Sequence, residues 1–404
     1  MTRTERQILA LKRWKEYKCR ATIVACTGFG KTRIALTAVQ KVLDKNPTAK
    51  IVIVVPTKIL KKQWIEHLQS KNLLAEVLVM NTAASKPFNC DMLVLDECHK
   101  INAEYMSNTL VNCTPGFILG LTATYERLDG REKILEHYAP VCDTITVEEA
   151  VTNGWLAPYR KYKVNLNVDL TEYNKATQTF LSSFSFFNFD WNTAMEAVSN
   201  KMFQIKLSQL YGCDLKQVQA NAYSFNRSLQ FRKKFIANHP KKLEIAKKIL
   251  NARSDKKCIT FNGSINMCKE YGFGDVIHSK QKDKENENII NKFISQDSGV
   301  LHTSKMANEG LDIPGLSVGI VTGFNSSKTT SIQVLGRVIR FEEGKTAELF
   351  ILVLNNTVEQ QWFKKSQEEQ EFIEINESEL QTVLDNKPID KQVKVQERVN
   401  VFRY

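Results

Sequence analysis

The sequence lacks any apolar run of the length that a membrane-spanning helix needs, about 18 to 20 residues. Its first residues, MTRTERQ, also lack the apolar stretch that follows the charged start of a secretory signal peptide. We therefore expect a protein of the cytoplasm, or of the host-cell cytoplasm if the chain is viral, that has no membrane partner.

Cysteine motifs are missing as well. The chain has 9 cysteines, but none forms a Cys-x-x-Cys pair and none lies at zinc-ligand spacing from one of the 6 histidines. Scattered single cysteines in a chain without a secretory signal are typical of reduced, mostly buried thiols. The sequence therefore gives no support for a structural zinc site.

Acidic residues are in the minority except near the C-terminal end. Residues 1–150 carry 21 Lys or Arg against 16 Asp or Glu, residues 151–365 carry 30 against 19, and residues 366–404 carry 5 against 9. A basic body suits a polyanionic partner, because Lys and Arg that neutralise phosphates release condensed counterions. Charge by itself does not decide this, since many basic proteins bind no nucleic acid.

Short, continuously apolar runs recur through residues 1–150. They are ATIVA at 21–25, IVIVV at 51–55, MLVLD at 92–96 and FILGLT at 117–122. Such β-branched and Leu-rich runs are typical of strands buried on both faces of a parallel sheet. Between the first two, Ile34, Ala38 and Val42 share one helical face, and Asn46-Pro47 ends the helix. This strand–helix–strand order predicts an open parallel α/β sheet.

The same alternation returns in residues 151–365. The later runs are CITF at 258–261, VLHT at 300–303, VGIV at 318–321 and LFILVL at 349–354. Residues from about 171 to 240 differ, because they have helical periodicity and few strand signals. The predicted fold is thus α/β, with a parallel-sheet lobe at 1–150 and a second lobe at 151–365 that holds a helical insertion at about 171–240.

The last stretch, residues 366–404, is rich in Glu and Gln. We predict an acidic C-terminal tail there: a short helix, then a loose or edge-pairing end. Protein partners, if the chain has them, are expected to bind through this tail.

The loop ACTGFGKT at 25–32 follows a predicted strand and opens a predicted helix. Glycines let backbone N–H groups approach phosphates, and a helix N-terminus adds partial positive charge there. Lys31 would reach the β- and γ-phosphates of ATP, and the Thr32 hydroxyl would ligate Mg²⁺. The usual pattern begins with Gly, where this chain has Ala25. The loop predicts an ATP site made by Thr27, Gly28, Phe29, Gly30, Lys31 and Thr32.

An acidic pair, Asp96-Glu97, ends another predicted strand in LVLDECH at 93–99. Asp96 would hold Mg²⁺ through water, and Glu97 would orient and deprotonate the water that attacks ATP. Taken alone, such a pair could equally be a helix N-cap. The GKT loop upstream favours the catalytic interpretation.

These motifs resemble, in type and order, those of superfamily 2 helicases, which are related to the DEAD/DEAH proteins. The resemblance covers about residues 1–365 and adds further motifs. They are VVPTKILKKQW at 54–64, GLTATYERLDG at 120–130, CITFNGSINMCKEY at 258–271, TSKMANEGLDIPG at 303–315 and QVLGRVIR at 333–340. RLDG at 127–130 and GWLAPY at 154–159 look like the branch that includes DNA-repair helicases and the branched-DNA helicases of large phages.

The resemblance implies further site residues. Gln7 would bind adenine, although Thr4-Glu5-Arg6 stands before it where the family usually has Arg-x-x. From the second lobe, Gln333, Arg337 and Arg340 would face the γ-phosphate, a role that suits arginine because its fork matches phosphate oxygens. The remaining implied residues are Gly310 and Asp312 at the nucleotide, and Thr57, Lys58, Thr303, Ser304 and Thr322 at the nucleic acid.

The implied protein is a nucleic-acid-dependent ATPase with two RecA-like lobes that bind ATP and Mg²⁺ between them. The family branch implies single-stranded, forked or branched DNA as the partner and 3′ to 5′ movement. An RNA helicase would share every catalytic motif, and so would a duplex translocase subunit of a restriction-type complex. The alternative from another class, a nucleic-acid-binding protein with an inactive ATPase, predicts damage at Lys31, Glu97 or Arg340, and all three are intact.

Two features of the insertion leave alternatives open. The aromatic stretch FLSSFSFFNFDW at 180–191 could stack on bases as a wedge, but the helical spacing of Phe180, Phe184 and Phe187 favours packing of the insertion against a lobe. The second feature is a basic set that could line a duplex path or simply solvate a helix: Arg232, Lys233, Lys234, Lys241 and Lys242.

Overall fold

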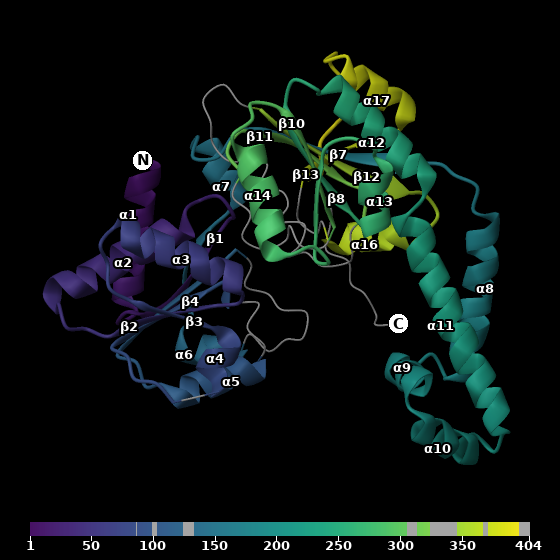
Figure 1. Ribbon diagram of the computed structural model, residues 1–404, viewed down its shortest axis with the longest axis horizontal. Coiled ribbons are helices and arrows are strands. Elements are labelled where there is room, and N and C mark those ends of the chain that lie inside the picture. Colours follow the sequence, from purple (N-terminus) through teal and green to yellow (C-terminus); the bar gives the residue numbers. More distant parts are fainter. Residues whose placement is uncertain are drawn as a thin grey trace.

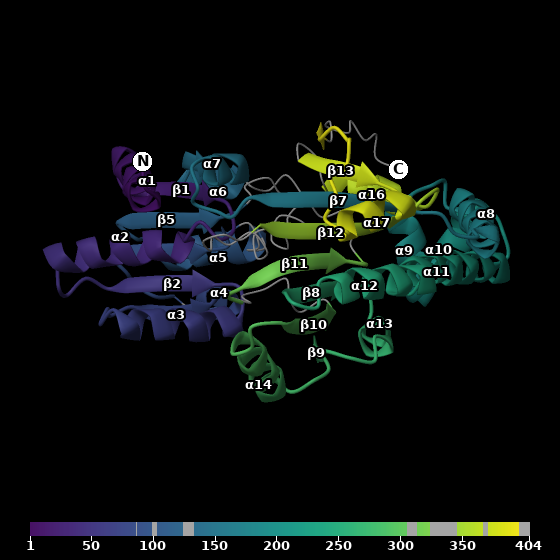
Figure 2. The same cartoon turned by 90° about the horizontal axis from the view of Figure 1, so that it is seen from above.

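The computed structural model describes residues 1–85, 87–98, 103–123, 133–304, 313–323, 346–366 and 371–395. Two helix-covered sheets lie side by side, and a helical arm projects from the second lobe on the side away from the first (Figures 1 and 2). The predicted fold class, an α/β chain of two RecA-like parallel-sheet lobes with a helical insertion in the second, is confirmed.

The first lobe contains a sheet with the strand order β3-β2-β4-β5-β1-β6. The strands are β1 (Arg20–Ala25), β2 (Ile51–Val55), β3 (Glu76–Val79), β4 (Met92–Asp96), β5 (Phe117–Thr122) and β6 (Val141–Ile145). All neighbouring strands pair in parallel. Every residue of β2 and β4 is buried, as expected for strands that are covered on both faces. Because the strands are parallel, β1 and β4 end at the same edge of the sheet, which is where α/β folds bind ligands.

Helices cover both faces of this first sheet (Figure 2). They are α1 (Arg3–Glu16), α2 (Lys31–Lys45), α3 (Lys58–Ser70), α4 (Met80–Ser85), α5 (Ala103–Asn112), α6 (Lys133–Tyr138) and α7 (Val147–Thr152). The start of α1 is fixed by a reciprocal capping box between Thr2 and Glu5, which satisfies two free backbone N–H groups.

The second lobe contains a sheet with the order β14-β13-β7-β12-β11-β8-β10-β9. Its strands are β7 (Tyr159–Leu166), β8 (Lys257–Asn262), β9 (Asp275–His278), β10 (Gly299–Ser304), β11 (Leu316–Val321), β12 (Ala347–Leu354), β13 (Glu371–Ile375) and β14 (Lys394–Val395). All pairs are parallel except β13 with β14. The helices of this lobe are α12 (Pro240–Ala252), α13 (Ile265–Glu270), α14 (Asp283–Ile294), α16 (Val358–Ser366) and α17 (Glu377–Leu384).

Part of the predicted acidic tail, residues 371–384, belongs to this second sheet, a placement that the sequence left open. β13 pairs with β7, and α17 follows it. Phe372 and Ile375 are buried, so the strand covers an edge that β7 would otherwise expose. One acidic residue of this strand forms an ion pair with the neighbouring strand: the Glu374 carboxylate lies 2.6 Å from the Lys163 ammonium of β7. Although burial opposes it, hydrogen bonds from Lys163, Lys394 and Asn165 lower the pKa of Glu374 to about 2.

The helical arm, residues 171–237, consists of α8 (Thr171–Phe186), α9 (Trp191–Ser199), α10 (Lys201–Tyr211) and α11 (Leu215–Ala237). It has a hydrophobic core of its own, in which Phe180, Phe184 and Phe187 pack with Phe225 of α11. The prediction that these phenylalanines pack is confirmed, but the expected partner was wrong. They pack inside the arm and not against a lobe, because α8 and α11 pair along their length (Figure 1).

The basic set near the end of α11 divides into different environments. Lys233 and Lys234 are exposed, whereas Arg232 lies over the rings of Phe180 and Tyr173. Lys241 pairs with Glu244 and Glu377. Lys242 is fully buried and paired with Glu359, so neither interpretation of this set, a duplex path or a solvated helix, holds for Lys242.

Candidate ATP site

The loop between β1 and α2 adopts a conformation that requires glycine. Gly28 and Gly30 have φ angles of 86° and 97°, in the left-handed region where other residues are strained. A Cβ on Gly30 would also lie 2.8 Å from the Gln7 amide nitrogen. Gly30 caps α2, so the loop delivers the free N–H groups of the helix N-terminus to the carboxyl edge of the sheet.

Two side chains of α1 hold this loop from behind. Gln7 donates a hydrogen bond to the Phe29 carbonyl at 2.9 Å, and Arg3 donates to the same carbonyl at 2.9 Å and to that of Gly28. The Arg3 guanidinium also lies 5.7 Å from the centre of the Phe29 ring. Both loop carbonyls therefore point toward α1. Within the loop, the N–H groups of Cys26 and Phe29 donate to the carbonyls of Ile145 and Cys26.

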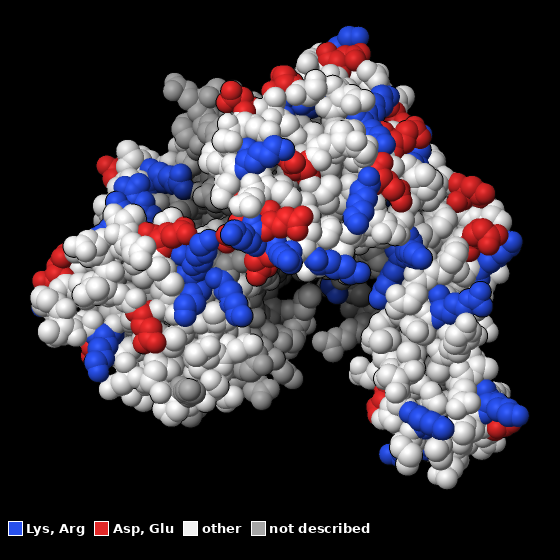
Figure 3. Space-filling model, viewed as in Figure 1, with Lys and Arg blue, Asp and Glu red and all other residues white. Residues whose placement is uncertain are grey.

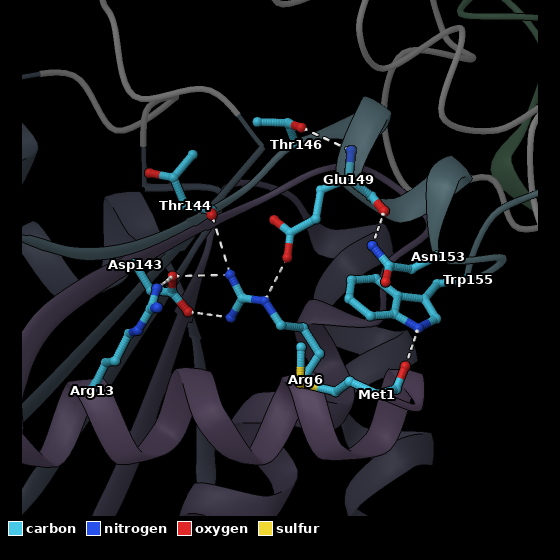
Figure 4. Close-up of polar contacts among 9 residues, drawn as sticks. All are labelled: Met1, Arg6, Arg13, Asp143, Thr144, Thr146, Glu149, Asn153 and Trp155. Atoms are coloured by element: carbon cyan, nitrogen blue, oxygen red, sulfur yellow. Dashed lines mark hydrogen bonds and ion pairs between the residues drawn. The ribbon is translucent and has the colours of Figure 1, made fainter.

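Arg6 docks α1 onto the first lobe (Figure 4). Its guanidinium lies 2.5 Å from the Asp143 carboxylate of β6 and 2.7 Å from the Glu149 carboxylate of α7, and it donates to the Thr144 carbonyl at 3.2 Å. Arg13 reaches the same Asp143 carboxylate. Burial would lower the pKa of Arg6, but its hydrogen bonds with the two carboxylates raise that pKa above its usual value. The Arg6 guanidinium therefore stays charged and fixes the position of α1 relative to the phosphate loop.

Trp155, from the GWLAPY motif, closes the other side of the loop. Its ring meets the buried Phe29 ring edge-on, with 5.5 Å between the ring centres. Its indole N–H donates to the Met1 carbonyl at 3.2 Å. The segment that leads into the second lobe is thus packed directly on the predicted phosphate loop.

Lys31 and Glu97 come together at the carboxyl edge of the sheet. The Lys31 ammonium lies 3.5 Å from the Glu97 carboxylate and 3.3 Å from the Ala25 carbonyl. Glu97 has a φ of 48°, a backbone conformation that is strained for a residue other than glycine. The two predicted catalytic residues, far apart in sequence, are therefore neighbours in space.

Asp96 is buried beside them. Its carboxylate accepts hydrogen bonds from the Trp64 indole at 2.8 Å and from the Glu97 backbone N–H at 3.0 Å. Burial and the neighbouring Glu97 carboxylate raise the pKa of Asp96 to about 6. The two donors fix the orientation of the carboxylate, and a cation at this position would restore its charge.

The loop and the acidic pair fit ATP and Mg²⁺. Among the described residues, the buried Thr27 hydroxyl has no hydrogen-bond partner, as expected for a group that awaits a phosphate oxygen. Thr32 lies in the first turn of α2, at the same edge as Asp96. Hard oxygen ligands of this kind suit Mg²⁺.

Several predicted residues of the second lobe cannot be placed. Gly310, Asp312, Gln333, Arg337 and Arg340 all lie outside the described residues, so their roles stay predictions.

The predicted nucleic-acid contacts are placed in two settings. In the first lobe, Thr57 caps α3 by accepting from the Leu60 N–H, and Lys58 is exposed. In the second lobe, Thr303 and Ser304 end β10 and Thr322 follows β11, and all three are buried in this structure. Side-chain contacts from these three would need a different conformation, and their roles also stay predictions.

Sequence reasoning missed Arg3, Arg6, Trp64 and Trp155 as supports of the site. One signal was available for α1: the spacing of Thr2 and Glu5 is a capping-box pattern, which places Arg3, Arg6 and Gln7 on one helix. Nothing in the local sequence links Trp64 to Asp96 or Trp155 to Phe29, because these pairs form only when the chain folds.

Basic side chains gather on the face shown in Figure 3, where the two lobes meet and along the arm. Lys62 of α3 and Glu287 of α14 form an ion pair of 2.8 Å across the two lobes. In the part of the chain that the structure describes, no helix is long and apolar enough to cross a membrane.

The fold and this site define a P-loop ATPase built from two RecA-like lobes. Two family models match the chain: the Helicase conserved C-terminal domain over residues 241–342, and the Type III restriction enzyme, res subunit, over residues 1–86 and 80–127. With the motif order, these matches show that the chain belongs to superfamily 2 of the helicases. It is a nucleic-acid-dependent ATPase, which confirms the predicted family and enzyme class.

Individual relatives agree with this family. The DNA 3'-5' translocase XPB2 of Sulfurisphaera tokodaii is 28% identical, over 90% of this chain and 84% of that protein. Putative helicase 22 of Sulfolobus islandicus filamentous virus is 26% identical, over 87% of this chain and 63% of its own length, which is under two thirds. Putative ATP-dependent RNA helicase QP509L of African swine fever virus is 32% identical, but over only 28% of this chain and 26% of its own length.

A solved structure supports the fold. The Pyrococcus furiosus Hef helicase domain has a TM-score of 0.53 at 16% identity, covering 90% of this chain and 97% of that chain. At this identity the likeness concerns the fold alone.

Proposed function

We propose that the chain is a DNA translocase that uses ATP and Mg²⁺ to move 3′ to 5′ along single-stranded, forked or branched DNA. The observation that carries the proposal is the meeting of Lys31, Glu97 and Asp96 at one edge of the first sheet. The choice of DNA and of polarity rests on the similarity to the XPB2 translocase, which covers both lobes.

The described residues supply the binding half of the reaction. The backbone N–H groups of Thr27, Gly28 and Gly30 and the Lys31 ammonium would hold the β- and γ-phosphates. Glu97 would then leave Lys31 and take a proton from the attacking water. Mg²⁺, when bound near Thr32 and Asp96, would neutralise phosphate charge.

The second lobe would complete the site. Arg337 and Arg340, with Gln333, would approach the γ-phosphate and stabilise the charge of the transition state. Loss of that phosphate would loosen the two lobes, and repeated cycles would move DNA that crosses both of them.

An RNA-directed activity is the second candidate, because QP509L, a putative RNA helicase, is similar over part of the chain. A duplex translocase is the third, since the matching model of the first lobe is that of a restriction enzyme subunit. Both would use the same ATP site, so only the choice of polynucleotide separates them from the first proposal.

ATP hydrolysis by the purified chain tests the proposal, measured alone and with single-stranded DNA, forked DNA, duplex DNA or RNA. We expect the strongest stimulation by single-stranded or forked DNA. Lys31→Ala should lower the stimulated rate by about a hundredfold or more, because it removes charge from the phosphate site. Lys41→Ala, on the exposed face of the same helix, is the matched control and should leave the rate unchanged.

Each alternative result has a consequence. Stimulation by RNA alone or by duplex alone would replace the proposal with the corresponding candidate. Hydrolysis that survives in Lys31→Ala would remove the assigned site. Displacement of streptavidin from the 5′ end but not the 3′ end of single-stranded DNA would support 3′ to 5′ movement, and the reverse would overturn it.

A further inference from the structure

The root of the arm, residues 237–242, lies against the ends of β8 and β11. A Cβ placed on Gly263 would lie 2.8 Å from the Ala237 Cβ, and one on Gly323 would lie 2.4 Å from the Gly263 backbone. Real Cβ atoms essentially never come this close, so these three segments are stacked with almost nothing but backbone between them. The Ser264 hydroxyl also donates to the Asn238 side chain. The arm is therefore seated directly on the carboxyl edge of the second sheet.

A buried ion pair fastens this contact. The Lys242 ammonium, in the first turn of α12, lies 2.6 Å from the Thr322 carbonyl and 2.5 Å from the Glu359 carboxylate. Both charged side chains are 0% exposed. Glu359 is itself held by the Leu354 backbone N–H at 2.9 Å. Lys242 thus links α12, the helix that follows the arm, to Thr322, the residue that follows β11, and Glu359 of α16 holds Lys242 in place.

Stability alone does not account for a charged pair here. Apolar residues of similar volume often replace a buried ion pair with no loss of stability, because removing two charges from water is unfavourable. Unlike an apolar side chain, the Lys242 ammonium has a fixed direction, because it must donate to the Thr322 carbonyl and to the Glu359 carboxylate. The Thr322 side chain is also held by a directional contact, because its hydroxyl donates to the Asn262 side-chain oxygen at 2.8 Å.

Thr322, which Lys242 contacts, lies just before the segment that carries the predicted arginines. The chain that leaves β11 after Gly323 carries Gln333, Arg337 and Arg340, and it re-enters the sheet at Ala347. Because β11 and β12 are parallel, its two ends lie at opposite edges of the sheet. Its second end lies beside Tyr159, at the start of the first strand after the first lobe. A shift of the arm root would therefore act directly on the start of this segment.

We propose that Lys242, oriented by Glu359, is a positioning residue that fixes the start of the arginine-bearing segment to the arm root. Through this joint, the position of the arm root alters the rate of ATP hydrolysis. The inference rests on the proposed ATPase function, and it concerns the rate at which that function turns over.

The test compares two double variants of the same helix. Lys242→Met/Glu359→Gln removes the charged pair at the start of α12. Arg253→Met/Glu348→Gln removes a second buried pair of 2.7 Å just past the end of the same helix, which ties α12 to β12 and not to β11. Thermal unfolding of both variants measures how much stability each one loses.

The expected result is a change in turnover and not in ATP binding. With saturating single-stranded DNA, Lys242→Met/Glu359→Gln should lower kcat about tenfold and leave the KM for ATP within about twofold. The control should keep kcat within about twofold even if it melts at a lower temperature. Equal losses of kcat in both variants, or none in either, would overturn the inference.

Hydrogen exchange of peptides covering residues 316–323 gives a readout that does not depend on activity. Exchange at the end of β11 should become faster in Lys242→Met/Glu359→Gln and stay unchanged in the control. If the wild-type chain hydrolyses no ATP, the proposed function fails. Hydrogen exchange still tests whether Lys242 holds the end of β11 in place. Unchanged exchange in the Lys242 variant would overturn the inference whatever the ATPase shows.

Discussion

Two contacts of this chain, here called joints, each hold a helix in place through a buried cation. They differ in the number of carboxylates that pair with the cation. In the first lobe, Arg6 holds α1 against the phosphate loop with two carboxylates, and one of these is shared with Arg13. In the second lobe, Lys242 holds the arm root with the single carboxylate of Glu359. The first joint has more than one carboxylate, whereas within the described part of the chain Lys242 pairs with one carboxylate, that of Glu359.

The comparison concerns how a buried cation holds a helix beside a site. Buried charge also occurs within the second sheet, where Glu348 of β12 pairs with Arg253. In each of the two joints a helix is held in one position beside a site, a task that directional contacts can perform. The expected consequence is that the first joint tolerates loss of a partner better than the second.

The largest effect is expected for Lys242→Met. The substitution leaves the Glu359 carboxylate buried with only a backbone N–H partner, so the free energy of unfolding should fall by about 3–5 kcal/mol. Urea unfolding followed by circular dichroism measures this. Adding Glu359→Gln should restore much of the loss, and a single variant within about 1 kcal/mol of wild type would contradict the account of this joint.

A smaller loss, about 2 kcal/mol, is expected for Arg6→Met, although Arg6 has more partners than Lys242. Asp143 keeps Arg13, and the Glu149 side chain is already 31% exposed and can take water. The KM for ATP should rise, because α1 no longer holds Gln7 and Arg3 against the loop. Urea unfolding and ATP titration measure the two effects, and a larger loss than in Lys242→Met would reverse the comparison.

His302 extends the comparison to a group that is buried without charge. It stacks on Tyr271, shares a hydrogen bond with Thr260 and donates to the Phe273 carbonyl, and burial lowers its pKa to about 4. Because the pKa of His302 is lower in the folded chain than in the unfolded chain, the unfolded chain binds the proton at a higher pH as the pH falls. Stability should therefore be complete above about pH 6.5 and fall by about 3 kcal/mol as the pH drops to 4.

The pH slope is measured by urea unfolding between pH 7 and 4. His302→Gln should show a shallower slope over this range, even if its stability at pH 7 is lower. A slope that matches the wild type would mean that other groups cause the acid sensitivity.

The smallest effect is expected for Arg13→Ala, at about 0.5 kcal/mol. Arg13 touches the same carboxylate as Arg6, but its side chain is 44% exposed, so water and salt screen the contact. Raising the salt concentration should reduce the effect further. A loss as large as that of Arg6→Met would show that Asp143 depends on both arginines, and the first joint would then have no spare partner.

The strands that could be predicted are those with continuously apolar sequences. β1, β2, β4, β5, β8, β10, β11 and β12 all coincide with runs that sequence patterns indicated. β7 and β13 were missed because Lys, Arg or Glu interrupts them: Lys163 and Glu374 sit in the strands and pair with each other. Their charges are acceptable only because the partner strand supplies the opposite sign, and this is invisible along the chain.

The site divides in a similar way. Lys31, Asp96 and Glu97 could be selected from motifs as candidate site residues, because phosphate binding and water activation each require particular residue types at the end of a strand. Their roles stay predictions. The side chains that hold them could not be selected in this way, since Trp64 meets Asp96 and Trp155 meets Phe29 only after folding. Lys242 shows the same limit most clearly, because Lys233 and Lys234 of the same basic set are exposed while Lys242 is buried.

By itself, then, the sequence determined the class of fold and the family, and it predicted the chemistry at the edge of the first sheet. Apolar periodicity and motif chemistry are local properties, so they can be found in a few consecutive residues. Tertiary structure alone decided which charges are buried, that the arm packs on itself, and that residues 371–384 complete the second sheet. The physical reason is that burial and pairing depend on partners distant in sequence, and only the folded chain brings them together.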